Sequence, residues 1–333
     1  MHAVRLHAFG PPENLRYEEV ADPVPGPGQL RIAVAAAGVH LIDTTLRAGK
    51  YGDGPMPAPR LPTVPGREVA GVVDALGEGA DPDWLGRRVV AHLGMVPGGY
   101  AELAVTDAAR VHRLPDGLGF PEAVAMIGTG RTTVGLLRLA GLTADDTVLV
   151  LAAAGGIGTL LVQHTRRLGA TVVGAAGGPA KTARVRSLGA DLAVDYARES
   201  WTGDVRDFLS ARGLGGVTVV LDAVGGALGH AATGLLSPGG RHLVYGWAAG
   251  GPVEFADGEL AARGITSHVL VGPALLKLTG TPEGMRGLET EALAAAADGR
   301  LVPAVETFPL ADAAAAHRAL ESRATMGKVV LLA

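Results

Sequence analysis

The chain has 333 residues, of which 48% are hydrophobic and 19% charged, with a formal net charge of −4 and no cysteine. At about 150 residues per domain, this length predicts two domains. The negative balance provides no basic field for nucleic acid or anionic lipid, and the lack of cysteine excludes disulfides and thiolate chemistry. No secretory signal and no bilayer-spanning apolar stretch of about 20 residues is seen, so a cytoplasmic protein is expected.

The first third of the chain, up to about Leu118, is typical of a β-rich domain. Clusters of proline and glycine separate its apolar runs, and strands are expected at residues 3–6, 30–36, 69–76 and 88–92. Near Phe120 the pattern changes, and residues 121–126 and 131–139 have the spacing of helices.

Beyond Thr147 the predicted strands and helices alternate. Strands are expected at residues 147–151, 171–175, 192–194, 217–221 and 241–245, with helices beginning near Gly158, Pro179, Asp204 and Ala227. Such alternation indicates right-handed βαβ units and a parallel sheet. The C-terminal part is expected to add a strand at 265–271, a helix at 283–298, a strand near Glu306, a helix at 310–322 and a strand at 328–332.

The turn after the first of these strands is typical of a phosphate site. Ala153, Gly155 and Gly158 fill the three small-residue positions of a G-x-G-x-x-G-like fingerprint, with Gly156 and Ile157 between them. Small residues let the backbone turn tightly and approach a pyrophosphate, and the following helix directs unpaired N–H groups at the anion. The segment therefore predicts dinucleotide binding; the alternative is a tight turn without a ligand.

The region about 20 residues further on bears on the choice of nucleotide. An NAD-preferring fold places an acid there for the ribose 2′-hydroxyl, whereas residues 174–178 read G-A-A-G-G. Pro179 begins a predicted helix and Lys181 falls in its first turn, which makes a second anion site. Together these features favour NADPH, with a solvated surface lysine as the alternative for Lys181.

Several stretches resemble one known family. They are A-A-G-V-H-L-I-D (36–43), L-R-A-G-K-Y (46–51), P-G-R-E-V-A-G-V-V (65–73), G-G-Y-A-E (98–102), A-A-A-G-G-I-G (152–158), L-G-A-D (188–191) and S-R-A-T-M-G-K-V-V-L (322–331). In this order they resemble the zinc-free quinone oxidoreductases, or NADPH:quinone reductases, of the medium-chain dehydrogenase/reductase superfamily.

The resemblance implies a fold and a cofactor site. The fold would combine a GroES-like β-rich catalytic domain, from residues 1–120 and 265–333, with a doubly wound Rossmann domain at 121–264, and the active site would lie between them. The resemblance also implies that Lys181, Tyr196 and Arg323 surround the 2′-phosphate of NADPH. A strand cap for Tyr196 and a surface charge for Arg323 are the alternatives.

The resemblance argues against zinc. Zinc-dependent relatives have Cys and His where this chain has His40 and Arg67. Because arginine stays protonated and offers no lone pair, no metal is expected. An improvised cluster of His40, Asp43 and Glu68 is the less favoured alternative.

The same comparison suggests the substrate-side residues. His40 stands where the family usually has Asn beside the nicotinamide, Tyr51 matches a pocket tyrosine, and Thr132, or Thr133 by a one-residue shift, matches a threonine against the nicotinamide. Hydride transfer to a quinone or enone moves charge onto its carbonyl oxygen, where Tyr51 and His40 would donate hydrogen bonds.

The leading hypothesis is thus a metal-independent, NADPH-dependent reductase of a quinone or α,β-unsaturated carbonyl, with no nucleic-acid or membrane partner. The alternatives are an enoyl-thioester reductase of polyketide or fatty-acid type and a non-catalytic NADPH-binding protein. A homodimer is expected, because the family commonly joins Rossmann sheets edge to edge and residues 265–271 would otherwise expose an apolar edge strand.

Overall fold

The computed structural model describes residues 1–50, 58–94 and 97–333. They form two compact units: unit 1 comprises residues 1–131, 289–299 and 303–333, and unit 2 comprises residues 132–288 and 300–302. These limits differ from the sequence-based boundaries at 120 and 265. Helix α2 (Phe120–Ala125) packs on the strands of unit 1, whereas β13 (Thr266–Val269) is a strand of the unit 2 sheet.

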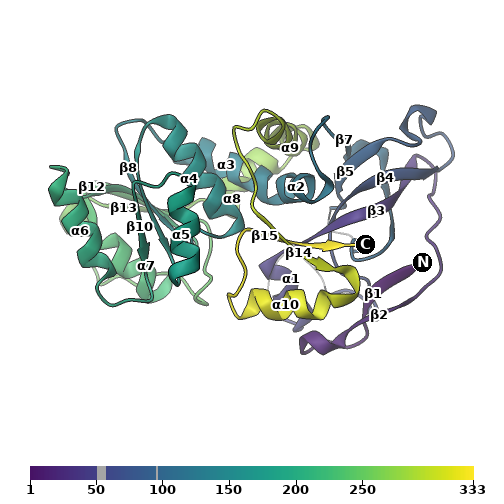
Figure 1. Ribbon diagram of the computed structural model, residues 1–333, viewed down its shortest axis with the longest axis horizontal. Coiled ribbons are helices and arrows are strands. Elements are labelled where there is room, and N and C mark those ends of the chain that lie inside the picture. Colours follow the sequence, from purple (N-terminus) through teal and green to yellow (C-terminus); the bar gives the residue numbers. More distant parts are fainter. Residues whose placement is uncertain (51–57, 95–96) are drawn as a thin grey trace. The chain divides into compact units, whose positions relative to one another are not determined.

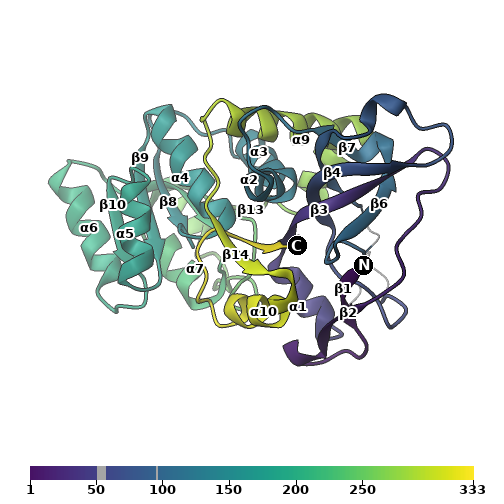
Figure 2. The same cartoon turned by 45° about the vertical axis from the view of Figure 1, so that its right-hand side comes forward.

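Unit 1 has the GroES-like fold and is built around one long strand. Strand β3 (Gln29–Val39) pairs along one edge with β4 (Glu68–Leu76), and its other edge is shared by β6 (Leu103–Asp107) and β15 (Lys328–Leu332) (Figure 2). The sheet continues through β5 (Arg88–His92) to β7 (Val111–Arg113) on one side and to β14 (Val305–Pro309) on the other. A separate hairpin joins β1 (His2–Leu6) to β2 (Leu15–Glu19).

The helices of unit 1 are short. They are α1 (Leu41–Arg47), α2 with a π-helical turn at Met126–Gly130, the end of α9 (Pro282–Ala297) from Glu289 onward, and α10 (Ala313–Glu321). Burial alternates along the first part of β3, where Leu30 and Ile32 are fully buried, and Val69 of β4 is also fully buried. Alternate burial is typical of a strand that packs one face on the core.

Unit 2 is a Rossmann domain with a six-stranded parallel sheet in the order β10-β9-β8-β11-β12-β13 (Figure 1). The strands are β8 (Thr147–Leu151), β9 (Thr171–Ala176), β10 (Leu192–Asp195), β11 (Val217–Asp222), β12 (Leu236–Val244) and β13. All five residues of β8 are buried, as expected for a strand covered on both faces. Strand order reverses between β8 and β11, which is where sheets of this class bind their ligands.

Helices connect these strands by the expected crossovers. They are α4 (Gly156–Leu168), α5 (Pro179–Ser187), α6 (Trp201–Ala211) and α7 (Gly226–Thr233), with α3 (Arg131–Ala140) before the sheet and α8 (Pro273–Thr279) after it. Among the described residues, no helix is long and apolar enough to cross a membrane.

The predicted strands and helices of the alternating region are confirmed. The start of one strand and two short helices were not predicted correctly, and each difference has a local cause. Strand β12 begins at Leu236 rather than near Arg241, because Pro238, Gly239 and Gly240 look like a turn and the pairing there contains a register shift. Helices α1 and α8 have seven residues each, too few for their periodicity to stand out.

Candidate functional site

The predicted phosphate turn follows β8 directly. Ala152 adopts a left-handed conformation with φ of 50°, and the Gly155 N–H donates to the Ala152 carbonyl at 2.9 Å. A Cβ at Gly158 would collide with that carbonyl oxygen and lie 2.8 Å from the Ala153 Cα. Glycine is therefore required at 158 for α4 to pack this closely on the end of β8.

This turn fits a pyrophosphate. Helix α4 begins at Gly156, so the N–H groups of Gly156, Ile157 and Gly158 belong to its first turn, where no intrahelical acceptor exists. The positive end of the helix dipole adds to their attraction for an anion. The geometry agrees with what the fingerprint predicted.

Lys181 and Tyr196 lie on neighbouring segments at the same edge of the sheet. Lys181 is in the first turn of α5, which begins after Gly178, and Tyr196 follows β10. A Cβ at Gly177 would lie 3.2 Å from the Tyr196 ring, so the ring packs against the loop that precedes Lys181. Both side chains are half-buried. The structure thus brings together two of the three residues expected at the 2′-phosphate.

Sequence reasoning missed Asp195, which ties these two loops together. Its Oδ1 accepts the N–H of Gly178 at 2.8 Å and that of Ala197 at 3.0 Å. These backbone hydrogen bonds hold the pKa of the Asp195 carboxyl below its usual range. The signal that could have identified Asp195 in the sequence is its place as an acidic residue at the carboxyl end of a predicted parallel strand.

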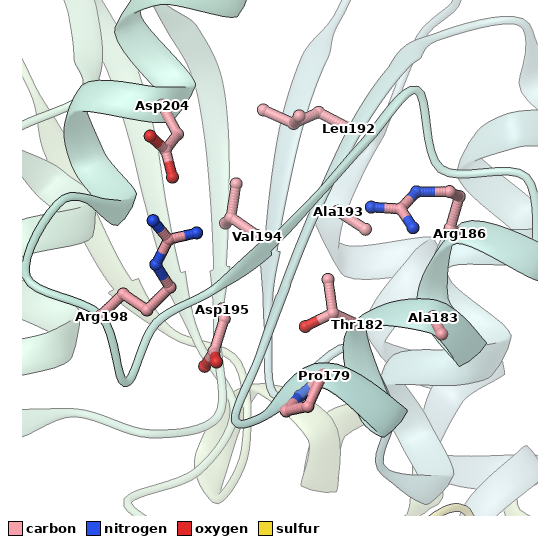
Figure 3. A pocket seen from close by; sticks show the side chains of 10 residues that line it. All are labelled: Pro179, Thr182, Ala183, Arg186, Leu192, Ala193, Val194, Asp195, Arg198 and Asp204. Atoms are coloured by element: carbon pink, nitrogen blue, oxygen red, sulfur yellow. The ribbon is translucent and has the colours of Figure 1, made fainter.

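A pocket of about 420 Å³ lies beside the open edge of β10 (Figure 3). Pro179 and Thr182 of α5 line one side, Arg198 and Asp204 line the other, and Asp195 lies between them. The pocket borders helix α5, which carries Lys181, and the loop after β10, which carries Tyr196. Neither of these two side chains lines the pocket.

The other predicted residues have different outcomes. Arg323 belongs to unit 1, where it is exposed and left-handed with φ of 57°, and its role at a 2′-phosphate remains a prediction. Thr132 is half-buried at the start of α3 in unit 2, whereas Thr133 is fully buried. Thr132 is thus the more accessible of the two threonines. Tyr51 lies outside the described residues.

In unit 1, His40 belongs to a buried charged trio with Glu68 and Lys328. Glu68 begins β4 and is completely buried, Lys328 begins β15 with its side chain 4% exposed, and His40 precedes α1 with its side chain 28% exposed. The Lys328 Nζ lies 2.8 Å from Glu68 Oε2 and 2.9 Å from His40 Nε2, which is itself 2.5 Å from Glu68 Oε1.

The charges in this region determine which groups are ionised. Burial by itself would raise the pKa of Glu68, but His40 and Lys328 hold it well below the usual range. Burial lowers the pKa of the nearby His92 to about 4, with a further contribution from Arg131. The His92 Nδ1 accepts the Gly94 N–H at 3.0 Å, so neutral His92 carries its proton on Nε2.

A second network in unit 1 fixes the backbone at His40. Asp43 accepts the His40 N–H at 2.8 Å and the Tyr100 hydroxyl at 3.1 Å, and it pairs with Arg67 at 3.5 Å. Tyr100 is completely buried, and its oxygen lies 3.3 Å from His317 Nε2. Burial lowers the pKa of His317 to about 4, so this histidine is neutral. The network joins α10 to the start of α1 and holds His40 in place.

These contacts bear on the question of a metal. Arg67 offers no lone pair, and the Glu68 carboxylate is paired with the Lys328 ammonium, which also lies 2.9 Å from His40 Nε2. Within the described residues, no group of three or more His, Asp and Glu side chains could hold a metal ion, so the alternative cluster of His40, Asp43 and Glu68 is not formed.

Comparisons with known proteins identify the family. Residues 26–116 match the family model of the alcohol dehydrogenase GroES-like domain, and residues 188–331 match that of zinc-binding dehydrogenase. The chain is 33% identical over 331 residues to a quinone oxidoreductase of Pseudomonas aeruginosa, covering 99% of this chain and 98% of the relative. The chain belongs to the quinone oxidoreductase family.

Other members and relatives extend this assignment. The chain is 32% identical to a 2-haloacrylate reductase of a Burkholderia species, covering 99% of this chain and 98% of that protein. It is 36% identical over 316 residues to a polyketide synthase system protein of Streptomyces orinoci, of which it covers only 13%. The structure of the Escherichia coli quinone oxidoreductase complexed with NADPH is similar, with a TM-score of 0.85, 29% identity and both chains fully covered. As a member of the quinone oxidoreductase family, the chain is an oxidoreductase of the medium-chain dehydrogenase/reductase superfamily.

The charged trio of this quinone oxidoreductase homologue predicts a stability effect. Lys328→Met should lower the free energy of unfolding by about 3–5 kcal/mol, because the buried Glu68 carboxylate would lose its lysine partner and keep only the half-buried His40 beside it. Adding Glu68→Gln should recover part of that loss. Urea unfolding checks both, with Lys277→Met on exposed α8 as the matched control. Equal stability of the Lys328 variant and the parent would refute the ion-pair assignment.

Proposed function

We propose that this protein is an NADPH-dependent reductase of quinones or α,β-unsaturated carbonyl compounds and works without a metal ion. The observation that carries the proposal is the fit of the turn at residues 152–158 to a pyrophosphate. Lys181 in the first turn of α5 and Tyr196 after β10 lie at the same edge of the sheet. The absence of cysteine fits a reducing compartment such as the cytoplasm.

NADPH, when bound, supplies the hydride, and the protein residues bind and orient it. The first-turn N–H groups of α4 bind the pyrophosphate, and Lys181, Tyr196 and Arg323 bind the 2′-phosphate. The relatives named as quinone oxidoreductase and 2-haloacrylate reductase support an acceptor with a conjugated carbonyl group.

On the substrate side, we assign His40 and Tyr51 as hydrogen-bond donors to the carbonyl oxygen, with Thr132 against the nicotinamide. Within the charged trio, the His40 side chain is the most exposed. Its Nε2 contacts the Glu68 carboxylate and the Lys328 ammonium, which fix the position of the ring. Donors at this oxygen stabilise the charge that develops as the hydride arrives. Lys328 provides the positive charge beside Glu68 and His40, so no metal is required to balance this carboxylate.

Stopped-flow oxidation of NADPH against a quinone, an enone and an enoyl-thioester tests the proposed activity. Quinone or enone should be reduced fastest, and EDTA treatment should leave the rate unchanged because no step uses a metal. NADPH fluorescence that changes on binding without oxidation by any acceptor would instead favour a non-catalytic NADPH-binding protein.

The cofactor preference rests on Lys181. Lys181→Glu should raise the KM for NADPH by about tenfold and leave that for NADH nearly unchanged, because only NADPH has the 2′-phosphate that the new carboxylate would repel. Steady-state kinetics with both nucleotides measure this. Lys277→Glu introduces the same charge change elsewhere in unit 2 and should affect neither KM. Equal effects of Lys181→Glu on both nucleotides would contradict the assignment.

A second candidate function is reduction of an enoyl-thioester. It is favoured by the 36% identity to a segment of a polyketide synthase system protein. The acceptor panel separates the two functions, since this candidate requires the thioester to be the fastest substrate.

We also propose a homodimer joined through β13. This edge strand pairs only with β12 among the described strands, all four of its residues are exposed, and Val269 is 48% exposed. A second copy would satisfy the open main-chain groups. Size-exclusion chromatography with light scattering at micromolar concentration should give twice the chain mass of 33.7 kDa, and a monomer would count against this interface.

A further inference from the structure

A fully buried carboxylate controls the loop after β11. Asp222 ends that strand, and its Oδ1 accepts the N–H of Val224 at 2.6 Å and that of Gly225 at 2.9 Å. Gly225 has a left-handed φ of 70°, so the loop turns sharply around this carboxylate. Asp222 therefore determines the path of residues 223–225.

The same loop is held to the loop that follows β12. The Tyr245 N–H donates to the Asp222 carbonyl at 2.7 Å, and the N–H groups of Ala248 and Ala249 donate to the carbonyls of Ala223 and Val224 at 3.0 and 2.8 Å. A displacement of the Asp222 carboxylate would thus move both loops.

The position of this loop is determined by the sheet order. Strand β11 lies next to β8, on the far side of the point where the order reverses, and both strands end at the same edge. Dinucleotides lie across this edge, with the pyrophosphate at the first turn and the adenosine toward the second strand. That second strand is β9, so the nicotinamide half of a bound dinucleotide would extend toward β11 and the loop at 223–225.

The other oxygen of Asp222 is held by a histidine. His242 of β12 is completely buried, and its Nε2 lies 3.0 Å from Asp222 Oδ2. Because a carboxylate only accepts hydrogen bonds, Nε2 carries a proton and donates it. The His242 Nδ1 lies 2.9 Å from the Ser267 hydroxyl of β13, the residue directly opposite in the parallel register. The Phe255 ring and this imidazole form a T-shaped pair, with the centroids 5.9 Å apart.

We propose that His242, anchored by Ser267, is a positioning residue for the nicotinamide half of NADPH and acts through Asp222 on the loop at 223–225. This inference rests on the proposed function. The hydrogen bonds run from the exposed edge strand β13 through β12 to the end of β11. Neither His242 nor Ser267 is required to touch the nucleotide, and both act by fixing the carboxylate that shapes its binding loop.

Two nucleotides distinguish this role from a general loss of structure. NADPH contains the nicotinamide half, whereas adenosine 2′,5′-bisphosphate contains only the adenosine half. His242→Leu should weaken NADPH binding by about tenfold, since a hydrogen bond to a charged group is lost, and leave the bisphosphate affinity unchanged. Isothermal titration calorimetry of the full-length protein measures both affinities.

Matched variants complete the experiment. His242→Gln keeps an N–H donor toward Asp222 and should retain NADPH affinity within about threefold, whereas Lys181→Glu should weaken both nucleotides. If His242→Leu does not fold, Ser267→Ala carries the test, with an expected weakening of about twofold to threefold for NADPH alone. Because Ser267 lies on β13, light scattering should show that this variant keeps the oligomeric state of the parent.

The outcomes separate the two proposals. NADPH affinity equal to the parent in His242→Leu, or in Ser267→Ala if that variant carries the test, overturns the positioning role. Equal weakening of both nucleotides also overturns it, since the effect would then not be confined to the nicotinamide half. If the unmodified protein binds neither nucleotide, the proposed function fails, and this inference fails with it.

Discussion

The buried carboxylate of Glu68 is the constraint around which unit 1 is arranged. An ionised carboxylate in the interior is strongly unfavourable unless an opposite charge lies beside it, and Lys328 supplies that charge from the last strand of the chain. This pairing requires β15 to return beside β3, whose other partners, β4 and β6, come from the first third of the sequence. The C-terminal strand β15 thus contributes Lys328 to the charged trio.

The pairing of Lys328 with Glu68 also determines the surroundings of His40. The Lys328 ammonium lies within hydrogen-bond distance of both the Glu68 carboxylate and the His40 ring, so the chain itself provides a cation that balances this carboxylate. Close packing maintains the arrangement, because Gly38 and Gly128 both lie directly against the Glu68 carboxylate, where a Cβ would collide with its oxygens. Larger residues at either position would displace the carboxylate and, with it, the ring of His40.

Unit 2 follows a different rule. Its parallel sheet directs several functional loops to one edge, because all six strands point the same way. The glycine turn is organised by main-chain packing at Gly158. The loops after β9 and β10 are organised by Asp195 and the loop after β11 by Asp222, each a carboxylate at a strand end that accepts backbone N–H groups.

The sequence by itself determined the features that depend on near neighbours in the chain. Apolar runs between proline and glycine clusters indicated the strands, and the small residues at 153, 155 and 158 predicted a tight turn. The place of Lys181 followed from the helix predicted at Pro179. These features are consequences of local spacing, which the sequence records directly, whereas Tyr196 was expected only from the family resemblance.

Only the tertiary structure decided which distant residues meet. His40, Glu68 and Lys328 span almost the whole chain, and so do Asp43, Tyr100 and His317 in the second network of unit 1. Asp222, His242 and Ser267 lie on the neighbouring parallel strands β11, β12 and β13. The pairing of these strands places Ser267 opposite His242 and Asp222 within hydrogen-bond distance of it. No local pattern encodes such contacts, since they arise from strand pairing between segments far apart in sequence, and the energy of burying a charge depends on the partner that folding brings to it.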